Sequence, residues 1–194
     1  MIDVHFVILG AVISSVGVAT YVRDTVRGET QPNRVTWLLW GIAPLIIFAV
    51  EIGDGVGLRA LITGMAAASA LAVFAASFAN QRAVWRIGPF DWACGALSVA
   101  GTIGWLLTRD GAVALLAAVV ADGLAGLPTV VKSWRQPATE SSGVYLCSLI
   151  SAVITLFTVR HVTLAVTTFP LYVVGMSGLQ TYLVSARRQV RILA

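Results

Sequence analysis

Seven apolar runs, each about 17 residues or longer, are the feature that most constrains the fold of this chain. A helix that crosses the hydrocarbon core of a bilayer needs about 20 apolar residues, with a lower limit near ~17. Short polar segments separate the runs, so each run is expected to form one transmembrane helix. The runs cover residues 4–22, 35–52, 58–79, 89–108, 111–131, 143–159 and 162–185.

The composition agrees with a membrane location. Of 194 residues, 58% are hydrophobic and only 11% are charged, whereas soluble domains carry about 25% charged residues. The sequence therefore predicts an integral membrane protein of one compact domain. The net charge of +4 comes from arginines scattered at the ends of apolar runs, which does not indicate nucleic-acid binding. The N-terminus contains Asp3 and His5 and lacks a basic segment, so the first run is expected to be retained.

The distribution of Lys and Arg predicts the orientation. Cytoplasmic loops carry an excess of these residues. The first, third and fifth loops and the C-terminal tail hold ten of them, and the other side holds Arg59, Arg109 and Arg160. We expect an extracellular N-terminus and a cytoplasmic C-terminus in a plasma membrane of bacterial type. The ten residues are Arg23, Arg27, Arg34, Arg82, Arg86, Lys132, Arg135, Arg187, Arg188 and Arg191.

The end of the first run and the end of the fifth run share an internal repeat. Four matches have a spacing of 109 residues and a fifth has a spacing of 108: Gly17 with Gly126, Thr20 with Thr129, Val22 with Val131, Arg23 with Lys132, and Trp37 with Tyr145. In each copy an outside-to-inside helix is followed by a basic polar loop. Two such units of three helices have the same orientation only if one extra helix joins them. We expect a first three-helix repeat in residues 1–80, a loop and linker helix in 81–110, and a second repeat with a cytoplasmic tail in 111–194.

This plan resembles that of the SWEET and PQ-loop transporters, which have parallel three-helix repeats. PQ-loop units end a helix in Pro-Gln, followed by a basic residue and a short polar stretch. The segment "LPTVVKSWRQPATESSGVYL" is similar, with Pro128, Lys132 and "TESSG" at 139–143. Thr129 and Thr20 stand where the family has glutamine, so neither Pro-Gln dipeptide is retained. The resemblance implies an all-α integral membrane fold in which seven transmembrane helices form two parallel three-helix bundles joined by a linker helix (3+1+3).

Asp122 is the least expected residue in an apolar run. About ten residues separate it from the nearest charged residues, Asp110 and Lys132, and a carboxylate near the bilayer centre costs about 2.5–3.5 kcal/mol on insertion scales. Two interpretations remain open. The carboxyl group could stay protonated and bind a hydroxyl of another helix, or it could bind a proton or substrate and face either side in turn. Thr129 shares its helix face.

Aromatic and polar side chains on other runs could line a solute path. Trp37 and Trp40 share one face of the second run, and Trp40 lies about one turn deeper. The second copy has a similar stripe that includes Tyr145 and Ser148. The seventh run contributes polar atoms, of which the Gln180 amide would need partners once buried. The residues expected to bind substrate or protons are Asp122, Trp40, Trp37, Thr129, Tyr145, Ser148, Tyr172 and Gln180.

The leading hypothesis is a transporter for a small polar solute that works by alternating access, with proton coupling through Asp122. A vitamin carrier of the nicotinamide-riboside type, similarly built of about seven helices, is a variant of this hypothesis. The alternative is a non-transporting membrane receptor, because the KDEL receptor also resembles this fold. The solute, the coupling ion and homo-oligomerisation are left open.

Other classes of function are not expected. The runs contain no Ser-His pair, HExxH motif or paired aspartates, so no catalytic residues are assigned and the chain is not expected to be an enzyme. A retinal photoreceptor needs a lysine inside the bundle, and the single lysine, Lys132, follows the fifth run. Cys94 and Cys147 lie in apolar runs without metal-ligand spacing, so neither a metal nor a cofactor is expected.

Overall fold

The computed structural model describes residues 2–53, 60–83, 85–107, 111–159 and 164–193. These residues form seven α-helices and two short 3₁₀ helices, with no β-strand among them, so the expected all-helical fold is confirmed. The α-helices are α1 (Phe6–Arg27), α2 (Arg34–Gly53), α3 (Ala60–Ala76), α4 (Pro89–Leu107), α5 (Gly111–Arg135), α6 (Ser142–Thr158) and α7 (Leu164–Leu193). The 3₁₀ helices are η2 (Gln81–Ala83) and η3 (Pro137–Thr139).

Specific residues end α1 and begin α2. Gly28 follows α1 with a φ of 77°, a left-handed conformation that glycine adopts readily, and its N–H donates to carbonyls of the last turn. Asn33 precedes α2, and its side-chain oxygen accepts the amides of Val35 at 3.0 Å and Thr36 at 3.2 Å. The Asn33 amide also donates to Asp91 Oδ1 at 2.5 Å. This last hydrogen bond ties the start of α2 to the start of α4.

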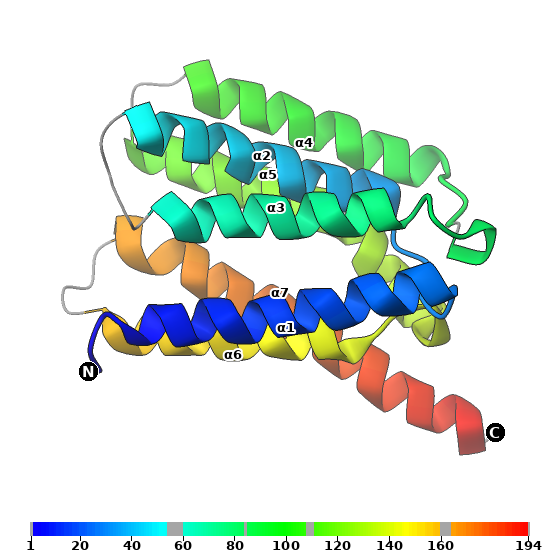
Figure 1. The fold of residues 1–194 in the computed structure, drawn as a ribbon. Coiled ribbons are helices and arrows are strands. Elements are labelled where there is room, and N and C mark those ends of the chain that lie inside the picture. The colour runs from blue at the N-terminus through cyan, green and yellow to red at the C-terminus, as the bar shows by residue number, and fades with distance from the viewer. Residues whose placement is uncertain (1, 54–59, 84, 108–110, 160–163, 194) are drawn as a thin grey trace.

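The helices form two trios with the same internal order (Figure 1). In the first trio α3 contacts both α1 and α2, and in the second α7 contacts both α5 and α6. Between the trios, α1 packs on α6 and α2 packs on α5. In each of these two contacts, the first helix of one trio meets the second helix of the other. Helix α4 packs on α5 and α2, and the chain termini lie at opposite ends of the bundle (Figure 1).

Two glycines allow the close approach of helices between the trios. A Cβ at Gly17 of α1 would lie 2.6 Å from Cβ of Cys147 in α6. A Cβ at Gly126 of α5 would lie 2.9 Å from Cζ2 of Trp40 in α2. Both distances are too short for a side chain to fit without movement. Gly17 and Gly126 are also matched in the sequence repeat, and the structure gives them matching places.

The helices differ from the apolar runs mainly at their ends. Helix α5 continues to Arg135 and α7 continues to Leu193, whereas the runs end at 131 and 185. An apolar run ends at the first polar residues. The helix itself continues through polar residues until a cap or a helix breaker such as Pro137 ends it. Arg59, Arg109 and Arg160, which were assigned to the extracellular side, lie outside the described residues.

In the described part of the chain, α1 is the one helix that is long and apolar enough to cross a membrane by length and composition. It lies near the N-terminus, and only 17% of its most apolar window is buried within the protein. The segments Gly64–Ala76 and Ser142–Thr158 are apolar but shorter. Signal sequences and core helices can share these properties, so α1 alone gives weak support to a membrane location.

The contact between α1 and α6 gives a stability prediction. Gly17→Ala is expected to lower the free energy of unfolding by about 1–3 kcal/mol, because the new methyl group overlaps Cys147. Thermal unfolding of the purified protein in detergent measures the change. Gly175→Ala in α7 is the control, since a Cβ there meets nothing within 4 Å. Equal midpoints for the two variants would contradict the tight packing of α1 on α6.

Candidate functional site

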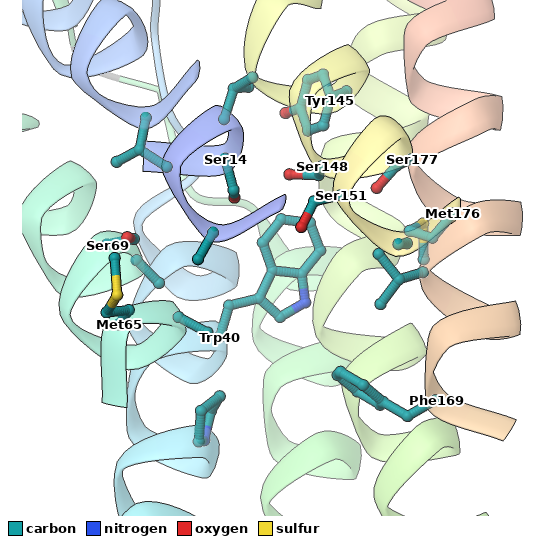
Figure 2. A pocket seen from close by; sticks show the side chains of 18 of the residues that line it. Ser14, Trp40, Met65, Ser69, Tyr145, Ser148, Ser151, Phe169, Met176 and Ser177 are labelled. Atoms are coloured by element: carbon teal, nitrogen blue, oxygen red, sulfur yellow. The ribbon is translucent and has the colours of Figure 1, made fainter. Parts of the chain in front are cut away.

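A cavity of about 330 Å³ lies between the two trios. Its walls come from α1, α2 and α3 of the first trio and from α5, α6 and α7 of the second, and the described residues of α4 contribute none. Figure 2 shows labelled side chains of α1, α2, α3, α6 and α7 around it. The lining is largely apolar, with a small number of polar groups, which is typical of sites that bind small molecules.

Asp122 of α5 lies on the wall of this cavity. Its carboxylate Oδ2 accepts a hydrogen bond from the Tyr172 hydroxyl of α7 at 2.7 Å. Its backbone carbonyl accepts a hydrogen bond from the indole N–H of Trp40 in α2 at 3.2 Å. The absent side chain of Gly126 leaves room for the Trp40 ring beside α5. Three helices from both trios therefore meet at Asp122.

The rest of the wall combines hydroxyl groups with aromatic and sulfur-containing side chains. Ser148 and Ser151 of α6, Ser14 of α1 and Ser177 of α7 line the cavity together with Trp40 (Figure 2). The apolar part includes Met65, Pro44, Phe169, Val173 and Met176. Hydroxyl groups can donate and accept hydrogen bonds, so this wall can hold a solute that is partly polar and partly apolar.

Six of the eight residues expected to bind substrate or protons line the cavity: Asp122, Trp40, Trp37, Tyr145, Ser148 and Tyr172. Thr129 and Gln180 do not contribute to its lining. The Thr129 hydroxyl donates to Thr36 Oγ1 at 3.0 Å, and that hydroxyl donates to the Ala125 carbonyl at 2.7 Å. Thr129 therefore joins α5 to α2 rather than facing a solute.

Gln180 is fully buried in α7. Neither atom of its side-chain amide has a hydrogen-bond partner among the described residues. The same is true of the Trp37 indole nitrogen. The hydrogen-bond partners expected for a buried Gln180 amide are therefore not found among the described residues.

Several lining residues were not predicted from the sequence. They include Ser14, Ser15, Ser69, Ser151, Ser177, Met65, Met176 and Phe169. A serine in an apolar run is ambiguous, because its hydroxyl can bond a carbonyl of its own helix. Ser15 does so with Ala11 at 2.9 Å. The only available signal was that Ser148 and Ser151 lie at helical spacing on a run that already held a candidate.

A layer of aromatic residues separates the cavity from one end of the bundle. Tyr21, Trp37 and Tyr145 belong to a buried hydrophobic cluster with Val73, Val144 and Val184. The Tyr21 and Trp37 rings lie 5.1 Å apart, and Trp37 meets Trp40 edge to face at 5.4 Å. Tyr21 is completely buried and Trp37 is 5% exposed. Buried aromatic side chains of α1, α2 and α6 therefore pack together at this level of the bundle.

A buried ion pair lies beyond the aromatic layer. The Lys132 ammonium at the end of α5 pairs with the Glu140 carboxylate, and both side chains are completely buried. Glu140 Oε2 accepts hydrogen bonds from the hydroxyls of Tyr21 at 2.7 Å and Tyr145 at 2.9 Å. Lys132 also donates to the Gln31 carbonyl. Tyr21 and Gln31 belong to the first half of the chain, so this network ties the two trios together at one end.

No protein-family model, curated protein or solved structure matches this chain. The side chains that line the cavity are therefore the basis on which a function can be proposed. The described residues contain no group of His, Cys, Asp or Glu side chains that could hold a metal ion. The described residues of the wall offer one carboxylate, several hydroxyl groups and aromatic faces, a combination that is typical of sites for small molecules.

The ion pair gives a second prediction. Glu140→Gln leaves the buried Lys132 ammonium without a counter-charge, and we expect a loss of about 3–5 kcal/mol in the free energy of unfolding. Thermal or denaturant unfolding in detergent measures the loss. Adding Lys132→Met to Glu140→Gln should restore part of it, because the unpaired charge is removed.

Asp24→Asn is the matched control. It breaks the ion pair of Asp24 with Arg23, whose side chain is 57% exposed, and such surface pairs contribute only about 0–1 kcal/mol. Equal effects of Glu140→Gln and Asp24→Asn would contradict the view that the buried pair holds this end of the bundle together.

Proposed function

We propose that this chain is an integral membrane transporter that carries a small polar solute by alternating access, with proton coupling through Asp122. The observation that carries the proposal is the cavity between the two trios, whose described wall residues comprise one carboxylate and side chains from six helices. Carriers commonly bind their solutes near the bilayer midplane, between repeats.

The surface of the bundle supports a membrane location. Large apolar side chains are exposed on helix after helix, with Leu107 of α4 at 79% and Ile8 of α1 at 63%. A soluble monomer rarely exposes contiguous apolar surface on this scale. A lipid environment would cover these side chains, which include Val16, Leu97, Ile103, Leu116, Val120, Phe157 and Leu171.

The order of the helices supports the 3+1+3 plan. Each trio has its third helix between the other two, and the contacts between trios are of the same kind in both directions. Helix α4 packs outside the cavity, as expected for a linker. This arrangement, together with the sequence pattern at Pro128 and Lys132, favours a distant relationship to the SWEET and PQ-loop transporters.

Closure at one end is consistent with one state of an alternating-access cycle. The aromatic layer and the Lys132–Glu140 pair lie at the end of the bundle that the basic loops assign to the cytoplasm. To open there, the hydroxyl of Tyr21 must leave Glu140 and the Gln31 carbonyl must leave Lys132. Rocking of one trio against the other would break these contacts together.

Reconstitution into liposomes tests transport. A pH gradient should drive uptake from a panel of radiolabelled small polar solutes, with internal pH followed by an entrapped dye. Asp122→Asn should reduce gradient-driven uptake to that of protein-free liposomes, because the Asn side chain cannot bind and release a proton as a carboxylate does. Its unfolding midpoint should stay close to that of the wild type, because the amide oxygen still accepts the Tyr172 hydroxyl.

Asp24→Asn, which alters a carboxylate outside the cavity, should retain wild-type uptake. Unchanged gradient-driven uptake in Asp122→Asn would contradict the role of Asp122. Saturable binding of a solute without any flux would favour the receptor alternative.

Labelling of single cysteines tests the orientation. With Cys94 and Cys147 replaced by serine, Val4→Cys should react with an impermeant maleimide on intact cells, because Val4 is exposed near the N-terminus. Gln136→Cys, at an exposed position after α5, should react only after permeabilisation. The reverse pattern would show that the orientation is wrong.

A further inference from the structure

We propose that the solute is a small organic cation, an amine or quaternary ammonium compound, which binds in the cavity with Asp122 as its counter-charge and Trp40 as an aromatic wall. This inference rests on the proposed transport function and names its substrate class.

The charge of the cavity supports a cationic ligand. Among the described residues that line the cavity, Asp122 is the one acidic side chain, and none is Lys, Arg or His. Beyond the aromatic layer, the buried Lys132 ammonium pairs with Glu140, and the Arg34 guanidinium donates to Ser77. An anionic solute would face the carboxylate without a compensating charge in a medium of low dielectric constant.

The carboxylate is only partly satisfied by the protein. Oδ2 accepts the Tyr172 hydroxyl, and the described residues provide no hydrogen-bond partner for Oδ1. Asp122 is partly exposed and lines the cavity, so its carboxylate group can meet a solute there. A neutral hydroxyl donor stabilises the carboxylate but does not neutralise it. An ammonium group beside Oδ1 would supply the missing charge.

Aromatic rings surround the position where such an ammonium group would lie. The Trp40 indole is fixed beside Asp122 by its hydrogen bond to the backbone carbonyl. Tyr172 donates to the same residue, and Phe169 lies 5.9 Å from the Tyr172 ring. Tryptophan is the aromatic side chain that attracts cations most strongly. The Met65 and Met176 side chains add soft, apolar contact surface.

The size and lining of the cavity favour an organic cation over a bare metal ion. At about 30 Å³ for each water-sized group, 330 Å³ holds roughly eleven such groups, which suits a solute of about ten non-hydrogen atoms. Inorganic cations of the Mg²⁺ or Ca²⁺ type need about six oxygen ligands, whereas this cavity has one carboxylate in a largely apolar wall.

Competition between a proton and the cation follows from the same geometry. A protonated Asp122 and an ionised Asp122 beside an organic cation both leave the cavity electrically neutral. The other titratable groups among the described residues of the wall are Tyr145, which donates to Glu140, and Tyr172, which donates to Asp122. Both are neutral phenols at physiological pH. Proton and cation therefore share one site, which is the requirement for exchange across the membrane.

Probe pairs that differ in charge but not in shape test the proposal. Choline and 3,3-dimethylbutan-1-ol form one pair, and benzylammonium and benzyl alcohol form another. Equilibrium binding to the full-length protein in detergent, checked by the shift in unfolding temperature, should favour each charged member by about tenfold or more. Asp122→Asn should remove this preference, and Trp40→Leu should weaken binding of the charged members.

Asp24→Asn serves as the control acid and should keep the preference. The proposal is overturned if the neutral member of both pairs binds as well as the charged one. It is also overturned if Asp122→Asn keeps the preference, or if neither charged probe binds at millimolar concentration. Asp122-dependent uptake of a neutral solute would leave the transport proposal standing while excluding a cation. Binding of choline without flux would support a cation site and contradict the transport proposal.

Discussion

The hydrogen bond between the Tyr172 hydroxyl and the Asp122 carboxylate, 2.7 Å long, is the interaction on which the rest of the structure depends. A carboxyl group in the middle of an apolar helix needs a polar partner and space that water or solute can occupy. Tyr172 gives it the partner and the cavity gives it the space. Trp40, held by the Asp122 backbone carbonyl, extends the same arrangement from the second trio to the first.

A buried polar network lies at one end of the bundle, where Lys132 pairs with Glu140 and the Tyr21 and Tyr145 hydroxyls donate to that carboxylate. Close packing at Gly17 and Gly126 brings α1 onto α6 and α5 onto α2, while the trios separate enough in between to leave a cavity. Beyond the cavity, the Lys132–Glu140 pair joins residues from both halves of the chain. The pair meets the first half of the chain through the Tyr21 hydroxyl and the Gln31 carbonyl, so separation of the trios at this end has to break both hydrogen bonds.

Much of this fold could be predicted from the sequence, and the reason is physical. Runs of apolar residues long enough to cross a bilayer have few alternatives to a helix, so the helices were predictable although their ends were not. Asp122 and Trp40 were recognisable because a carboxylate or a large aromatic ring is conspicuous in such a run. Ser14 and Ser69 were not, since a serine can bond its own helix. The pairing of Lys132 with Glu140 depends on the path of the chain between α5 and α6. The spacing of apolar residues in the sequence does not reveal that path.

The most direct test of the account is whether water reaches the cavity beside Asp122 in a membrane. Ser148→Cys, in a protein without its two native cysteines, should react in proteoliposomes with a water-soluble methanethiosulfonate reagent, because Ser148 lines the cavity. Leu146→Cys, exposed on the outer face of the same helix, should react far more slowly, since these reagents need a thiolate in water. An inert Ser148→Cys, or one no faster than Leu146→Cys, would show that the compartment is dry and that Asp122 does not serve a transport path.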